Sequence, residues 1–212
     1  MAQLTAVLFD FGDTLFYSPD GAGLMVEEGL APDLADRLWR EIWASARSAA
    51  ELARQRDVSP ERHREAWTRL FARAEPHLPG VSERLYERVM VTDNWTPFPD
   101  SERTLPWLKE RGVRVGVVSN VTSDLRPAFA RHGLDAFVDS FTHSFEQRVE
   151  KPDPRIFLAA CEALGSRPAE TLMVGDSHLA DGGAVEAGLT TLLLPPVSRG
   201  TERGLDLVTK LF

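Results

Sequence analysis

The second half of the chain alternates short apolar runs with helix-like segments, and this alternation limits the possible folds more than any other feature. The apolar runs have the length of buried strands and lie at residues 113–118, 136–142, 171–174 and 190–194. Amphipathic segments separate them, and several of these end at a glycine, the usual residue after a helix. Strands that alternate with helices form a parallel sheet covered by helices on both faces. We therefore predict an α/β fold.

A further apolar run, Val7–Phe9, lies far upstream of the others and must join the same sheet to bury its side chains. Residues 16–94 follow it and show helical spacing, without a convincing strand. Helices are expected there at about 32–56, 60–74 and 82–91. The sequence thus predicts two domains: an α/β core of residues 1–15 and 96–212, and an inserted all-helical domain of residues 16–95.

Composition narrows the class of protein. The 212 residues carry a formal net charge of −8, which disfavours general binding to nucleic acid or to a membrane surface. No apolar run is long enough to cross a membrane. Cys161 is the only cysteine, so an internal disulfide is excluded, and its helical flanks predict a small core residue. We expect a cytoplasmic protein that is a monomer or homodimer.

Polar side chains stand where the predicted strands end. Asp10 follows the first strand, Ser119 follows the run at 113–118, and Asp176 follows the run at 171–174. Lys151 precedes a helix, and Asp181 lies one turn after Asp176. Taken singly, each could be a helix cap or a loop residue. Because the carboxyl ends of parallel strands converge on one crevice, their joint occurrence predicts a single site.

In this order, the segments resemble the four motifs of the haloacid dehalogenase-like hydrolase superfamily, and the resemblance spans essentially the whole chain. The motif segments are Asp10–Leu15, Val118–Asn120, Lys151–Phe157 and Gly175–Asp181. The resemblance implies a Rossmann-like parallel sheet whose first strand is central. It also implies that the helical block is the family's cap, which closes over the active site and selects the substrate.

The resemblance implies a nucleophile and a metal site. Asp10 would attack the substrate and form a covalent aspartyl intermediate, which divides one difficult displacement into two easier ones. Asp10, Asp176 and the backbone carbonyl of Gly12 would hold Mg²⁺, a hard cation that prefers oxygen ligands. Asp181 would lie behind these ligands or hold a metal-bound water.

The resemblance also assigns a phosphate-binding role to the second and third motifs. Ser119 and Asn120 would bind phosphoryl oxygens, and Lys151 would neutralise the charge that develops in the transition state. Phe11 and Gly12, directly after the nucleophile, would complete the substrate-binding residues.

The first motif departs from the pattern of the family's phosphatases. They carry a second aspartate two residues after the nucleophile, which protonates the leaving oxygen and then activates water. Here that position is Gly12, and Asp13 follows where glycine is usual. Asp13 could act if the turn is remodelled. Otherwise acid–base help is missing, a loss of roughly two to four decades in rate.

The alternatives therefore stay open at this point. We predict a Mg²⁺-dependent phosphatase of a small phosphorylated metabolite, because Asp176 and Asp181 retain an acidic metal site. The family's dehalogenases also lack the second aspartate and need no metal, so a 2-haloacid dehalogenase is the alternative enzyme. A catalytically weakened phosphate-binding protein is the third possibility. His178 is a minor candidate for substrate contact, and no role is assigned to His63.

Overall fold

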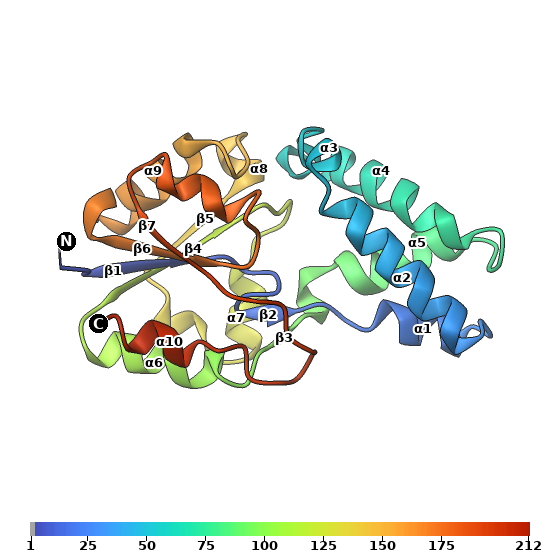
Figure 1. Ribbon diagram of the computed structural model, residues 1–212, viewed down its shortest axis with the longest axis horizontal. Coiled ribbons are helices and arrows are strands. Elements are labelled where there is room, and N and C mark those ends of the chain that lie inside the picture. Colours follow the sequence, from blue (N-terminus) through green and yellow to red (C-terminus); the bar gives the residue numbers. More distant parts are fainter. Residues whose placement is uncertain (1–2) are drawn as a thin grey trace.

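The computed structural model describes residues 3–212, and its centre is a five-stranded parallel sheet (Figure 1). The strands run in the order β5-β4-β1-β6-β7, with β1 in the middle. Their bounds are β1 Ala6–Phe9, β4 Arg114–Ser119, β5 Ser140–His143, β6 Thr171–Gly175 and β7 Thr190–Leu193. Phe9 pairs with Val117 on one side and Val174 on the other. The predicted α/β fold with a central first strand is confirmed.

Both faces of the sheet are covered by helices, so β1 is buried completely. Val7 and Phe9 face one layer, and Ala6 and Leu8 face the other, as the two-residue period of a strand requires. The first layer contains α6 (Ser101–Glu110), α7 (Arg126–Arg131) and α10 (Asp206–Thr209), and the second contains α9 (Pro154–Leu164). A short helix, α8 (Ser144–Gln147), follows β5.

The helical block packs around its own apolar core beyond the carboxyl ends of the strands (Figure 1). It comprises α1 Gly21–Glu27, α2 Pro32–Ala46, α3 Ala49–Leu52, α4 Pro60–Phe71 and α5 Val81–Leu85, which continues as a π-helical turn over Tyr86–Met90. Trp39 stacks on Phe71, and Trp43 packs edge-on against Trp67. The two chain crossings pair as the antiparallel strands β2 (Phe16–Tyr17) and β3 (Thr96–Pro97). We call this helical block the cap.

Several predicted elements differ from the structure. The helix expected over 32–56 ends at Ala46, because Ser48 accepts a hydrogen bond from the Glu51 amide and starts a new helix there. The strand expected from 136 begins only at Ser140, since residues 135–137 form a 3₁₀ turn. The segment between β6 and β7 contains a 3₁₀ helix, Asp181–Val185, consistent with the low helix propensity of its two glycines. Within residues 16–94, where the sequence shows no convincing strand, Phe16–Tyr17 forms β2. Two residues are too few to show the alternation of apolar and polar side chains that indicates a strand.

Cys161 is buried and free, as expected for a core residue. Among the described residues, no helix is long and apolar enough to span a membrane. The cytoplasmic location and the oligomeric state stay predictions.

Adjacent glycines at 182 and 183 provide a test of the packing beneath the strand ends. A Cβ on Gly183 would approach the Pro152 Cα to 2.8 Å and its carbonyl oxygen more closely still, whereas nothing lies within 4 Å of one on Gly182. We expect Gly183→Ala to lower the free energy of unfolding by about 1–3 kcal/mol, because backbone cannot move aside cheaply. Gly182→Ala should change it by no more than about 0.5 kcal/mol. Urea denaturation of both variants checks this, and equal effects would contradict it.

Candidate active site

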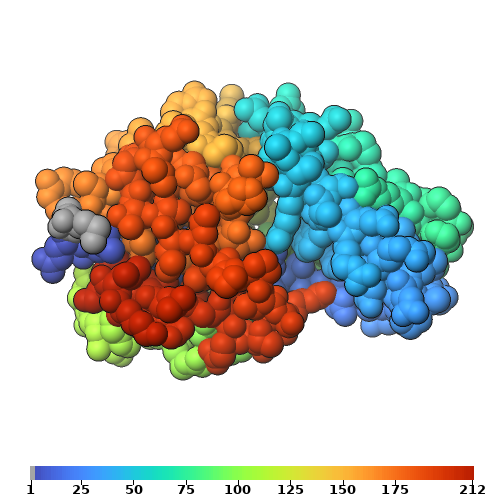
Figure 2. Space-filling view, in the orientation of Figure 1, coloured from blue at the N-terminus to red at the C-terminus, as the bar shows by residue number. Residues whose placement is uncertain are grey.

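A cavity of about 170 Å³ lies where the cap meets the carboxyl ends of the central strands. Figure 2 shows the molecule hollowed between these two parts. The core contributes the sequence-predicted residues to its wall: Asp10, Phe11, Gly12, Asp13, Ser119, Asn120 and Lys151. The cap contributes aromatic and charged side chains, including Trp43, Arg47, Arg56, Asp57, His63 and Trp67. The cavity therefore has one wall from each part of the molecule.

Lys151, which lines this cavity, joins the carboxylate of Asp10 in the cavity wall to the buried carboxylate of Asp181. Its Nζ lies 2.7 Å from Oδ1 of Asp10 and 2.6 Å from Oδ1 of Asp181. The Phe11 amide donates to the same Asp10 oxygen at 2.7 Å, so these contacts leave Oδ2 of Asp10 available. Burial raises the pKa of Asp10 to about 6, although Lys151 opposes the shift. Burial alone would lower the pKa of Lys151, but the charges of Asp10 and Asp181 raise it.

The loop after β6 brings a third carboxylate, that of Asp176, close to those of Asp10 and Asp181. Oδ2 of the fully buried Asp181 accepts hydrogen bonds from the amides of Asp176 and Ser177, at 3.0 and 2.9 Å. Carboxylate oxygens of Asp10, Asp176 and Asp181 all lie within 4.8 Å of one another. Burial and the charge of Asp10 raise the pKa of Asp176 to about 7.

This cluster has the donor chemistry of a divalent-cation site. Its donors are hard oxygens, and burial, together with the negative charge of the neighbouring carboxylates, raises the pKa values of Asp10 and Asp176. Asp181 is already occupied by Lys151 and two amides, so it orients its neighbours rather than offering a free oxygen.

The second-motif residues differ in what they contact. The side chain of Asn120 forms two hydrogen bonds with the backbone of Lys151. Its oxygen accepts from the Lys151 amide at 2.8 Å, and its nitrogen donates to the Lys151 carbonyl at 3.0 Å. Its side-chain amide therefore fixes Lys151 instead of facing the cavity as a free donor. Ser119 is buried in the cavity wall. The Phe11 ring packs on Phe16, so this residue meets the site mainly through its backbone.

The unusual Gly12-Asp13 pair is accommodated by Trp95. A Cβ on Gly12 would lie 3.1 Å from the Trp95 ring, so the ring covers the side from which another residue type would project. Asp13 takes a left-handed conformation with φ 54°, which explains why glycine is usual at this position. Its carboxylate pairs with Arg47 of the cap, which also lies 3.3 Å from Asp176.

Three charged or titratable cap residues of the cavity wall carried no sequence signal for a role in the site: Arg56, Asp57 and His63. Arg56 stacks over the Trp67 ring at 4.8 Å from its centroid. Arg56 and Asp57 are buried, although a charged pair between two helices is typical of an exposed loop. His178, by contrast, is exposed and does not line the cavity.

The burial of His63 in this wall should make the folded protein less stable at acidic pH. Burial, with help from the charge of Arg56, lowers its pKa from 6.5 to about 3. Below pH 6.5 the unfolded chain therefore binds a proton at His63 that the folded protein does not bind. His63 thus lowers the free energy of unfolding as the pH falls. Between pH 7 and about pH 4.5, wild type should lose about 2–3 kcal/mol more free energy of unfolding than His63→Gln. Urea denaturation at both pH values measures this, and parallel losses would refute it.

The sequence profile of the haloacid dehalogenase-like hydrolase family matches residues 4–188. The chain belongs to this family. It is 32% identical to the glyceraldehyde 3-phosphate phosphatase of Methanothermobacter thermautotrophicus, over 98% of this chain and 92% of that protein. It is also 30% identical to (S)-2-haloacid dehalogenase 4A of Burkholderia cepacia, over 72% of this chain and 71% of that protein.

Solved structures also include a dehalogenase of closely similar fold. That structure has a TM-score of 0.75 and 25% sequence identity, and the match covers 100% of this chain and 98% of that one. Both phosphatases and dehalogenases are therefore among the proteins that this chain resembles.

Proposed function

We propose that this haloacid dehalogenase-like hydrolase is a Mg²⁺-dependent phosphatase of a small phosphorylated metabolite, acting through an aspartyl-phosphate on Asp10. The observation that carries the proposal is the cluster of three carboxylates formed by Asp10, which lines the cavity, with Asp176 and Asp181. The family's dehalogenases, by contrast, need no metal. The phosphatase relative is also matched over more of the chain than the dehalogenase relative.

Mg²⁺ would be held by carboxylates of Asp10 and Asp176 and by the Gly12 carbonyl, and it would screen the negative charge of the phosphate from these carboxylates. Oδ2 of Asp10 would attack phosphorus while Oδ1 stays bound to the Phe11 amide and Lys151. Lys151, fixed through its backbone by Asn120, would stabilise charge on the phosphoryl oxygens, and Ser119 would donate to one of them.

The second candidate is a 2-haloacid dehalogenase, favoured by the missing aspartate at Gly12. The two are separated by assaying purified protein with p-nitrophenyl phosphate, glyceraldehyde 3-phosphate and (S)-2-chloropropionate, each with Mg²⁺ and with EDTA. We expect phosphate release that needs Mg²⁺ and no chloride release. Metal-independent chloride release would instead establish the dehalogenase. Binding of phosphate without turnover of any compound would favour a non-catalytic protein.

A further inference from the structure

The proposed reaction requires a proton donor for the leaving oxygen, and the first motif does not supply one. Gly12 has no side chain, and the Trp95 ring packs against it. Asp13 is engaged by Arg47. The cap side of the cavity wall contains another carboxyl group.

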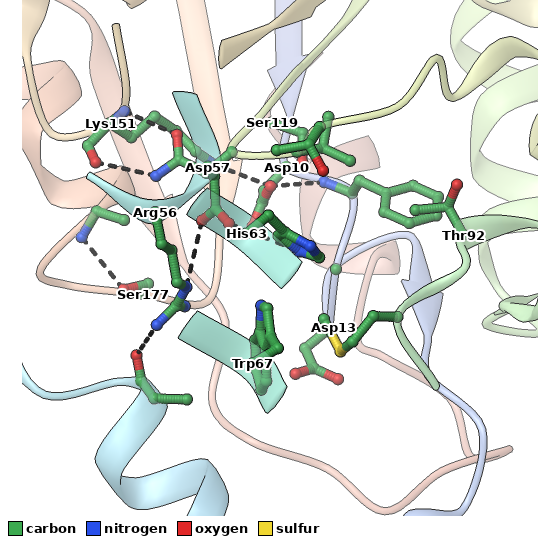
Figure 3. A pocket seen from close by; sticks show the side chains of 18 of the residues that line it. Asp10, Asp13, Arg56, Asp57, His63, Trp67, Thr92, Ser119, Lys151 and Ser177 are labelled. Atoms are coloured by element: carbon green, nitrogen blue, oxygen red, sulfur yellow. Dashed lines mark hydrogen bonds and ion pairs between the residues drawn. The ribbon is translucent and has the colours of Figure 1, made fainter. Parts of the chain in front are cut away.

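Asp57 is such a group. It lies in the 3₁₀ turn Arg56–Val58 between α3 and α4, lines the cavity, and is only 5% exposed. Figure 3 shows its carboxylate between Arg56 and Asp10. Since Asp10 rises from the core side of the cavity, a phosphoryl group on it would direct its leaving group toward the cap side, where Asp57 lies.

The position of Asp57 is set by the core, although the residue belongs to the cap. Its amide donates to Oε1 of Glu150 at 2.5 Å, next to Lys151. Its carbonyl accepts from the Ser144 hydroxyl at 2.6 Å, and this hydroxyl in turn accepts from the Val121 amide at 2.9 Å. Both backbone groups of Asp57 are thus tied to the elements that hold the site, which pre-organises its carboxyl group.

The same side of the cavity has an unused hydrogen-bond donor. Nε1 of Trp67 is buried without a hydrogen-bond partner among the described residues, whereas Nε of Arg56 faces the Asp57 carboxylate at 3.5 Å. Buried polar groups normally have partners, so a donor left open in a cavity wall points to a polar ligand group there. The hydroxyl or carbonyl oxygens of a phosphorylated metabolite have the required chemistry.

We propose, on the basis of the phosphatase function above, that Asp57 is the general acid and base that replaces the missing aspartate at Gly12. In the first step, Oδ2 of Asp10 bonds to phosphorus and the bond from phosphorus to the leaving oxygen breaks. The leaving oxygen takes the electron pair of that bond and the proton of Asp57, and an alcohol departs. In the second step, water attacks phosphorus and gives a proton to Asp57, and the bond to Asp10 breaks with its electrons returning to the carboxylate. Phosphate is released.

The electrostatic surroundings of Asp57 suit this exchange. Burial raises its pKa to about 6, which lets both the acid and the base form exist near neutral pH. Its neighbours are Arg56, with Nε at 3.5 Å, and His63, with Nε2 at 3.7 Å. The charge of Lys151 lowers the pKa and that of Asp10 raises it, while Glu150 faces the backbone side.

Leaving-group dependence tests the proposal, because a good leaving group needs little protonation. In Asp57→Asn, we expect kcat/KM for phenyl phosphate to fall roughly 100- to 10,000-fold, while kcat/KM for p-nitrophenyl phosphate falls less than about 10-fold. With the latter substrate, kcat should still fall, preceded by a burst of p-nitrophenol, because the second step lacks its base. The matched variant Asp13→Asn should affect the two substrates by the same factor.

Each other outcome is decisive. If Asp57→Asn, shown to be folded by circular dichroism, slows both esters equally, Asp57 is not the acid and the phosphatase function stands. If only Asp13→Asn depends on the leaving group, the role belongs to Asp13. If wild type hydrolyses neither ester with Mg²⁺, the proposed function fails and the role of Asp57 with it.

Discussion

Asp10→Asn should reduce kcat for p-nitrophenyl phosphate by at least about 1,000-fold, because an amide cannot replace the attacking carboxylate. The fold should be kept. The asparagine oxygen can still accept from the Phe11 amide, and Lys151 still pairs with Asp181. Burial raises the pKa of Asp10, so a neutral side chain removes an unfavourable buried charge and should leave the protein at least as stable as wild type at pH 7.

Steady-state kinetics with saturating Mg²⁺, together with thermal unfolding, measure both parts of this prediction. Asp13→Asn is the matched control, since it makes the same chemical change at another carboxylate of the cavity wall. Its loss of activity should be much smaller than that of Asp10→Asn. If Asp10→Asn kept a tenth or more of the wild-type activity, the nucleophile would have to be another group.

Lys151→Met should have the second large effect, and it should change both activity and stability. The ammonium lies 2.7 and 2.6 Å from two carboxylates, and methionine of similar length removes only the charge and its hydrogen bonds. Leaving buried carboxylates without their cation should lower the free energy of unfolding by about 3–5 kcal/mol. Loss of the cation facing the phosphoryl group should reduce kcat by about 100-fold or more.

The double variant Asp10→Asn/Lys151→Met separates charge balance from general damage to the core. Removing one carboxylate together with the cation should restore part of the lost stability, without restoring activity. Urea denaturation of the two single variants and the double variant gives this coupling energy. If the changes in the free energy of unfolding of the two single variants simply add in the double variant, the Asp10–Lys151 contact carries no energy of its own.

The core side of the site could be predicted because its signals are local. Apolar runs and helix-ending glycines define the strands, and a parallel sheet then brings Asp10, Ser119 and Asp176 to one edge whatever the details of packing. The predicted contact of Lys151 with this edge also appears in the structure. Trp43 and Trp67 pack in the apolar core of the cap and also line the cavity.

The cap side could not be predicted, because its residues depend on how two separately folded parts meet. Arg56 and Asp57 form a polar turn whose sequence is typical of solvent, and only docking onto Ser144 and Glu150 buries it. Asn120 shows the same limit. Its type suits phosphate binding, but its partner is the backbone of Lys151, which follows a different strand.

Rapid-quench mass spectrometry of the enzyme mixed with excess p-nitrophenyl phosphate and Mg²⁺ tests most directly whether Asp10 is phosphorylated during turnover. We expect a phosphoryl adduct on the peptide that contains Asp10, present within one turnover and absent in Asp10→Asn. Phosphate release at the wild-type rate with Asp10 unmodified at every time point would contradict this expectation.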